Sequence, residues 1–75
     1  MAEVEKRSVT IRGHRTSFSL EQPFYDDLIA NAAQRSLSLA ALVAEIDETR
    51  TRDANLSSAL RLYVLAWAKR GGATS

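Results

Sequence analysis

The chain has 75 residues, of which 45% are apolar, and it contains no cysteine and a single histidine. This length supports one small domain with a limited core, which we expect to be stabilised by association with other chains. The missing cysteines exclude disulfides and thiolate zinc sites, and one histidine excludes a multi-histidine metal site. The N-terminus lacks the apolar segment of a signal peptide, and the longest apolar run, residues 59–68, is too short to span a bilayer. We therefore expect a cytoplasmic protein with no membrane partner.

The formal net charge of +1 hides an uneven distribution along the chain. Residues 6–20 carry four cations and no carboxylate, residues 21–49 carry six carboxylates and one cation, and residues 50–75 carry five cations and one carboxylate. A basic N-terminal segment is compatible with a polyanionic partner and, more often, with an ordinary solvated surface.

Residues 8–20 combine β-branched, aromatic and hydroxyl side chains in a period-two alternation, which predicts strand structure. The apolar residues are odd-numbered before Gly13 and even-numbered after it, so the alternation must shift near Gly13-His14. A β-bulge at Gly13 would produce this shift. So would a two-residue hairpin with Gly13 first in a type II′ turn, which pairs Ile11 with Thr16.

Both alternatives predict the same two faces for this segment. The apolar face consists of Val9, Ile11, Thr16, Phe18 and Leu20. The opposite face is basic, rich in hydroxyl groups and free of carboxylates, and consists of Thr10, Arg12, Arg15, Ser17 and Ser19.

Three helices follow in the predicted order. Pro23 suits the first turn of a helix that extends to about Arg35. Ser38 is a favourable N-cap for a second helix, and Asn55 for a third that ends before Gly71. The second helix has a buried stripe made of Leu39, Leu42, Val43 and Ile46. The third has a core stripe made of Leu56, Leu60, Val64 and Trp67.

The third helix also carries Leu62, Tyr63 and Leu65 outside its core stripe, so it is apolar nearly all round. A monomer of this size cannot cover so much apolar surface, and we therefore expect a partner chain to cover it. Flexible tails are expected at residues 1–7 and 71–75, on either side of one domain at residues 8–70.

This arrangement resembles the ribbon-helix-helix domain of the Arc/MetJ type over residues 16–46. The similarity lies in the alternating Phe18 and Leu20, in Pro23 at a helix start, in Leu28, and in Ser38 at the next helix start. From Lys6 to about Leu65 the chain resembles a bacterial branch with an extended N-terminal strand region and an added third helix. The resemblance implies a mainly α fold with a short N-terminal β ribbon, assembled as an intertwined homodimer. An unpaired strand would favour such a dimer, because it leaves its edges unsatisfied.

In this family the outward strand side chains contact base edges in the major groove, and the N–H groups that open the second helix hold a phosphate. By resemblance, the base-facing residues are Arg12, Arg15, Ser17 and Ser19. The implied phosphate contacts are Ser38, Leu39, Ala40, Lys6 and Arg7. The implied dimer core is Phe18, Leu20, Leu28, Leu42, Ile46 and Trp67. No metal or cofactor is implied.

Two of these base-facing positions hold serine, which discriminates bases poorly, where relatives often have longer side chains. A third reading position falls near Glu21, which DNA would repel unless it caps the first helix.

The resemblance implies a homodimeric DNA-binding protein, a bacterial transcriptional regulator that inserts a β ribbon into the major groove of double-stranded DNA. The alternative is a protein-interaction module, antitoxin-like or adaptor-like, that docks another protein through the third helix. An enzyme is not expected, because the sequence offers no nucleophile with a base, no metal ligand set and no phosphate loop. We interpret His14 as a turn residue. The adjacent carboxylates Asp26 and Asp27, and Asp47 and Glu48, are interpreted as a solvated acidic face.

Overall fold

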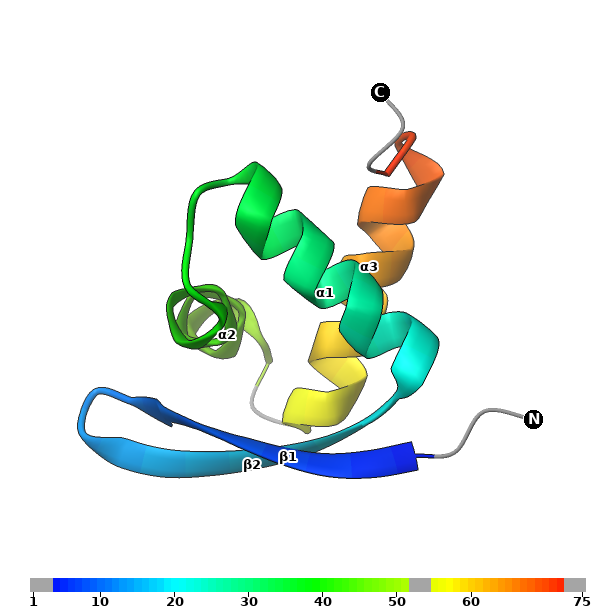
Figure 1. Ribbon diagram of the computed structural model, residues 1–75. Helices are drawn as coiled ribbons and strands as arrows, with labels where there is room; N and C mark the ends of the chain where they lie inside the picture. Colours follow the sequence, from blue (N-terminus) through cyan, green and yellow to red (C-terminus); the bar gives the residue numbers. More distant parts are fainter. Residues whose placement is uncertain (1–3, 52–54, 73–75) are drawn as a thin grey trace.

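A computed structural model describes residues 4–51 and 55–72, and Figure 1 shows a β hairpin with three helices above it. The elements in chain order are β1 Val4–Ile11, β2 His14–Glu21, α1 Gln22–Gln34, α2 Leu39–Thr49 and α3 Leu56–Lys69. The strands form a two-stranded antiparallel sheet. A short ribbon followed by three helices confirms the predicted fold class, and the register and turn of the ribbon correct the sequence analysis in detail.

The turn of the hairpin consists of Arg12 and Gly13, whose φ angles are +49° and +79°. Positive φ at both central residues is typical of a type I′ turn, which matches the twist of the flanking strands and favours glycine in the second position. Ile11 consequently pairs with His14, and Val9 with Thr16. The bulge and the type II′ turn with Gly13 first were therefore both wrong. The strand residues predicted for each face nevertheless lie together, because the observed register also pairs odd residues with even ones, but Arg12, predicted on the basic face, lies in the turn.

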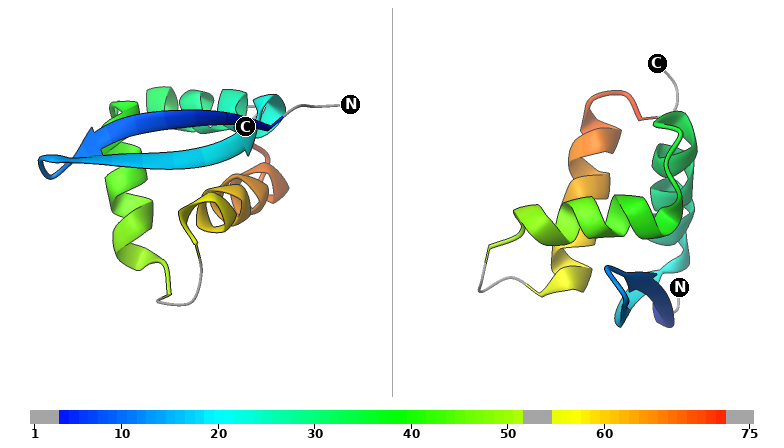
Figure 2. Two further views of the ribbon diagram at one scale, coloured as in Figure 1. Left: turned by 90° about the horizontal axis from the view of Figure 1, so that it is seen from below. Right: turned by 90° about the vertical axis from the view of Figure 1, so that its left-hand side faces the viewer.

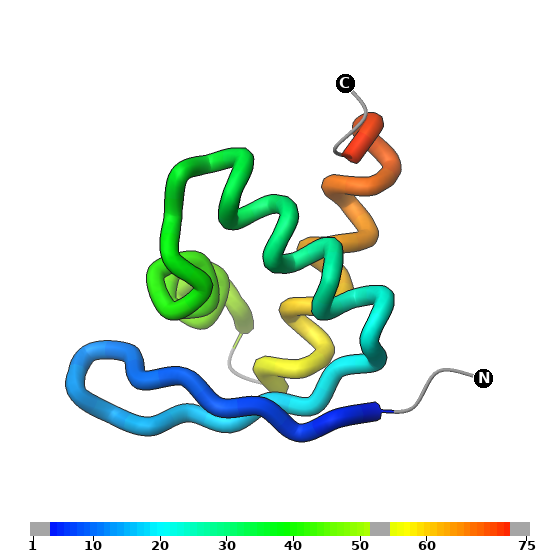
Figure 3. The backbone as a smooth tube through the Cα atoms, viewed as in Figure 1, coloured from blue at the N-terminus to red at the C-terminus, as the bar shows by residue number. Residues whose placement is uncertain are grey.

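β1 is longer than the sequence predicted. The strand begins at Val4, which pairs with Glu21, so the segment from Val4 to Arg7 belongs to the sheet and not to a tail. Of the expected tail of residues 1–7, only 1–3 lie outside the described residues. Because α1 follows β2 directly, it starts beside the first residues of β1, as the backbone path in Figure 3 shows. At the other end Gly72 donates its N–H to the carbonyl of Trp67 (3.0 Å) and closes α3, while residues 73–75 lie outside the described ranges.

The predicted caps of α2 and α3 are confirmed. The Ser38 hydroxyl accepts a hydrogen bond from the N–H of Ala41 at 3.1 Å, and the Asn55 side chain accepts one from Ser58 at 2.8 Å. Each cap satisfies an N–H group that the first turn of a helix leaves without a partner. Glu21 precedes α1 without a side-chain cap, and Pro23 lies in the first turn, where its missing N–H costs nothing.

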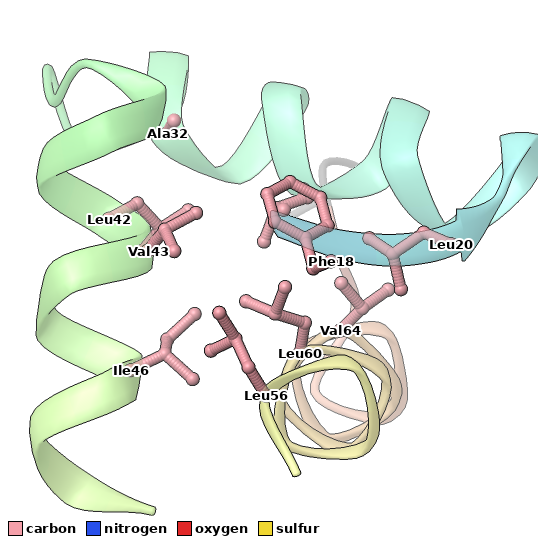
Figure 4. Close-up of a cluster of buried hydrophobic side chains, with 10 residues drawn as sticks. Phe18, Leu20, Ala32, Leu42, Val43, Ile46, Leu56, Leu60 and Val64 are labelled. Atoms are coloured by element: carbon pink, nitrogen blue, oxygen red, sulfur yellow. The ribbon is translucent and has the colours of Figure 1, made fainter. Parts of the chain in front are cut away.

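The core lies between the inner face of the hairpin and the three helices. Its buried members are Phe18, Leu20, Leu28, Ala32, Leu42, Val43, Ile46, Leu56, Leu60 and Val64. Figure 4 shows side chains of α2 and α3 pointing toward one another beside Phe18 and Leu20 of β2. Every residue expected in the dimer core is buried within the single chain, including Trp67 at 7% exposed. The apolar face of the hairpin is thus covered by the helices of its own chain.

A polar network ties the three helices together beside this core. Arg35, which ends α1, forms a two-pronged ion pair with Glu45 of α2 and donates a hydrogen bond to the Tyr63 hydroxyl of α3 at 3.1 Å. The same hydroxyl donates to the side-chain oxygen of Asn31 at 2.7 Å. Because Asn31 is almost fully buried, its oxygen needs this partner.

Candidate nucleic-acid interface

The middle of the hairpin face that points away from the helices is formed by six polar side chains, three from each strand, and the pair of Val4 and Glu21 continues this face at its open end. The six are Lys6, Ser8 and Thr10 of β1 and Arg15, Ser17 and Ser19 of β2, and we call this set the outward face. Alternation along each strand places these residues opposite the buried Phe18 and Leu20. Seen from below in Figure 2, the hairpin lies in front of the helices, which leaves the outward face accessible. Five of the six residues are exposed and Ser19 is half-buried.

The outward face carries two cations, four hydroxyl groups and no carboxylate. At its end lies Glu21, whose side chain accepts a hydrogen bond from Arg61 of α3 at 2.9 Å. This hydrogen bond, followed by one to the Glu21 backbone, lowers the pKa of the Glu21 carboxyl. The Glu21 carboxylate, which we expected to repel DNA, is therefore paired with the Arg61 cation. Glu21 makes no side-chain cap for α1.

A hydrogen bond between the strands shapes the outward face. The Arg15 guanidinium donates from Nη2 to the hydroxyl of Ser8 at 3.1 Å. Since Ser8 pairs with Ser17 in the sheet, this contact runs diagonally across the hairpin. The guanidinium is thereby held over the centre of the ribbon.

Two of the predicted DNA-contacting arginines lie elsewhere. Arg12 is in the turn, where its left-handed backbone removes it from the strand alternation, and its guanidinium forms an ion pair with Glu48 of α2. Arg7 lies on the inner face and stacks over the Tyr25 ring at 3.6 Å. Arg7 also forms an ion pair with Glu5 at 2.6 Å. Neither guanidinium therefore lies on the outward face beside that of Arg15.

The predicted phosphate contact at the start of α2 forms a separate group. Ser38 is exposed, Leu39 and Ala40 are half-buried, and the Ser38 hydroxyl is used as the helix cap. The N–H groups of the first helical turn lack partners within the helix and favour an anion. In Figure 1 α2 lies above the hairpin, on the side opposite the outward face, whereas Lys6 belongs to the outward face itself. The phosphate role of these residues stays a prediction.

Sequence reasoning overlooked Ser8, because the segment before it was taken as a tail and the hairpin that was considered had another register. The period-two alternation of Lys6, Ser8 and Thr10 was the signal that could have placed it on the face. Among the residues in ranges 4–51 and 55–72, no group of three histidines or carboxylates could hold a metal ion. Within the same ranges no helix is long and apolar enough to cross a membrane.

A two-stranded ribbon with helices packed on one face and a basic, hydroxyl-rich opposite face defines a class of small nucleic-acid-binding folds. The family model described as the ribbon-helix-helix domain matches residues 4–68. The chain therefore belongs to the ribbon-helix-helix domain family, whose members generally bind DNA as dimers in transcription regulation and are typically not enzymes. No curated protein and no solved structure gives a significant match.

Proposed function

We propose that this chain is a cytoplasmic, homodimeric bacterial transcriptional regulator that inserts its hairpin into the major groove of double-stranded DNA. The observation that carries this proposal is the outward face, which offers cations and hydroxyl groups and no carboxylate on a ribbon of two strands. Hydroxyl and guanidinium groups donate to the acceptors of base edges and phosphates. Membership of a DNA-binding family supports the same conclusion.

The dimensions of the ribbon suit this role. Neighbouring strands lie about 4.8 Å apart, and the major groove of B-DNA is about 12 Å wide and admits a two-stranded ribbon. With the helices all on the inner side, the hairpin can enter the groove first. Arg15 would then face base edges, Lys6 would meet a phosphate, and the N–H groups around Ser38 would hold the flanking backbone.

The homodimer is supported by the family and by apolar surface left on α3. Leu62 and Leu65 are 63% and 46% exposed, although Leu56, Leu60 and Val64 of the same helix are buried. Burying the exposed part of each leucine against a second copy would contribute about 1–2 kcal/mol, because each side chain is already partly covered.

The test is DNA binding by variants of the outward face. Duplexes selected from a random pool should bind the wild-type protein with an affinity that falls steeply with salt, because phosphate contacts release counterions. Arg15→Ala should weaken binding by about 1–3 kcal/mol if Arg15 contacts a base, or flatten the salt slope if it contacts phosphate. Ser17→Ala should have a smaller effect. Arg70→Ala, beyond the end of α3, is the matched control and should bind like the wild type.

Wild-type protein that binds no duplex at moderate salt would refute this proposal. So would a set of variants in which Arg15→Ala binds as tightly as Arg70→Ala.

The second candidate function is protein docking through α3, and the exposure of Leu62 favours it. Beside Leu62 lies a hollow of about 360 Å³, lined by Ile46, Thr49, Arg50, Thr51, Ala59, Leu62 and Tyr63. A docking module would lose its partner on Leu62→Ala and tolerate Arg15→Ala. A DNA-binding protein would show the opposite dependence.

A further inference from the structure

We infer that Arg61 of α3 is a positioning residue for DNA binding, because it neutralises the Glu21 carboxylate at the open end of the outward face. This inference rests on the proposed DNA binding and adds to it a role for the third helix. It uses only contacts between α3 and the C-terminal end of β2, so it does not depend on which chain supplies the neighbouring strand.

Glu21 is placed where bound DNA would feel its charge. It is the last residue of β2, and alternation puts it on the same side of the strand as Ser17 and Ser19. Its side chain is 28% exposed. A ribbon in the major groove lies between two phosphate backbones, which together carry one negative charge for about every 1.7 Å of helix axis. An unpaired carboxylate at this end of the ribbon would therefore weaken binding.

A carboxylate at this position also has a structural reason. Glu21 is the N-cap residue of α1, and the partial positive charge at a helix N-terminus favours an anion. The side chain makes no cap hydrogen bond, so this attraction acts through space. The position thus has two opposing requirements, because α1 favours a negative charge there and DNA on the outward face disfavours it.

Arg61 satisfies both requirements from a helix forty positions further along the chain. Its Nε atom donates to Oε1 of Glu21 at 2.9 Å, and this hydrogen bond lowers the pKa of the Glu21 carboxyl. Glu21 therefore stays ionised beside α1, while the guanidinium next to it cancels its charge toward DNA. The Arg61 side chain is 31% exposed, so the pair lies at the surface that DNA would approach.

Backbone contacts hold Arg61 at this place. The Ser19 carbonyl accepts from Nη2 of Arg61 at 3.3 Å, and the Ser19 N–H donates to the Ser57 hydroxyl at 2.9 Å. Both backbone groups of Ser19 thus point toward α3 and away from the strand on the other edge of β2. A strand on that other edge, from the same chain or from a partner, leaves these bonds in place.

The pair decides how much positive charge the ribbon presents. Lys6 and Arg15 are the two cations of the outward face, and an unpaired Glu21 would cancel one of them. An ion pair as exposed as this one adds little to the stability of a fold. Its main consequence is therefore the charge that meets the phosphates, which sets both the affinity for DNA and its dependence on salt.

The experiment compares the wild type with Arg61→Ala, Glu21→Gln and the double variant, after urea unfolding has shown that each is folded. Binding of selected duplexes is measured at several salt concentrations. Arg61→Ala should bind about two- to thirtyfold more weakly, the effect of one charge about 8 Å from a phosphate at effective dielectric constants between about 80 and about 20. Arg70→Ala also removes one cation, but from beyond the end of α3, and should bind like the wild type.

The double variant restores the balance of charge and should bind more like the wild type than like Arg61→Ala. Glu21→Gln keeps Arg61 and its bond to Ser19, so it tests the same charge even if Arg61→Ala does not fold. It should bind at least as tightly as the wild type and with a steeper salt dependence, because Arg61 is then an unpaired cation.

Arg61→Ala that binds as tightly as Arg70→Ala would overturn the inference. A double variant as weak as Arg61→Ala would overturn it too, because Arg61 would then act through the backbone of β2 and not through Glu21. Weaker binding by Glu21→Gln would show that the carboxylate assists DNA binding, which is the opposite of the inference. Wild-type protein that binds no duplex would instead refute the proposed function.

Discussion

The backbone N–H of Ser19 in β2 donates a hydrogen bond to the hydroxyl of Ser57, the second residue of α3, across 2.9 Å. Thirty-eight positions separate the two residues in the sequence. The contact joins the last helix to the strand edge that would otherwise be open to a neighbouring chain. Arg61, one helical turn further on, reinforces it through Glu21.

Ser57→Ala should destabilise the protein by about 1–3 kcal/mol, because the partly buried N–H of Ser19 loses its acceptor. The urea midpoint would measure this loss, and amide exchange should accelerate at Ser19 more than elsewhere in β2. Ser58→Ala is the control, since it makes the same change of helix propensity at the next residue. Equal midpoints and equal exchange in the two variants would show that the edge contact contributes nothing.

Trp67→Ala should cost about 3–5 kcal/mol, the usual range for removing a large aromatic side chain from a core. Trp67 is 7% exposed, and its ring N–H donates to the Gln34 side chain at 3.1 Å. Thermal unfolding measures the loss, and the wild-type emission should be blue-shifted. Arg70→Ala, which removes an exposed side chain just beyond α3, should change stability by no more than about 0.5 kcal/mol. Emission typical of water-exposed tryptophan would contradict the buried position.

Glu45→Gln should flatten the acid dependence of stability. The hydrogen bonds from Arg35, with a smaller contribution from its charge, lower the pKa of the Glu45 carboxyl below its ordinary value of 4.5. A lowered folded-state pKa stabilises the protein above the unfolded value, and this contribution is lost as the pH falls through the folded value. Urea midpoints from about pH 7 to about pH 3 should therefore fall more steeply below pH 4.5 in the wild type than in the variant. Asp27→Asn, which removes an exposed carboxylate of α1, is the control. Parallel curves for the wild type and Glu45→Gln would show that the Arg35–Glu45 ion pair does not stabilise the protein.

Gly13→Ala should destabilise the hairpin by about 1–2 kcal/mol through backbone strain alone. Gly13 has a φ of +79°, and a Cβ atom at this position would meet no atom within 4 Å. Gly13→Asn should cost less, because asparagine tolerates the left-handed region. Thermal unfolding monitored by circular dichroism would rank the three proteins. An alanine variant as stable as the wild type would mean that the turn is not held in the type I′ conformation.

Local chemistry accounts for most of what could be predicted. Ser38 and Asn55 cap their helices as expected, because a side-chain oxygen next to free N–H groups acts within one turn. The stripe from Leu56 to Trp67 is buried as expected, because helical periodicity alone places these side chains on one face. The parity of Phe18 and Leu20 likewise predicted which side of the ribbon meets the core.

Distant contacts account for what could not be predicted. Arg12 and Arg15 have the same charge and lie three positions apart. Arg12 lies in the turn, where it forms an ion pair with Glu48 of α2, while Ser8 holds Arg15 on the face. Nothing near Arg12 in the sequence encodes the position of Glu48, which follows only from the crossing of α2 over the hairpin. Ser8 was missed for the same reason, because its place depends on a register that the turn sets.

The sequence by itself determined the strand and helix periods, the caps of α2 and α3, the side of the ribbon that meets the core and the family, since each depends on neighbours a few residues apart. The tertiary structure alone decided that β2 pairs within its own chain and that α3 covers its second edge through Ser57 and Arg61. The physical reason is that a strand edge can be satisfied by any suitable strand or side chain. Which one satisfies it depends on how the whole chain packs.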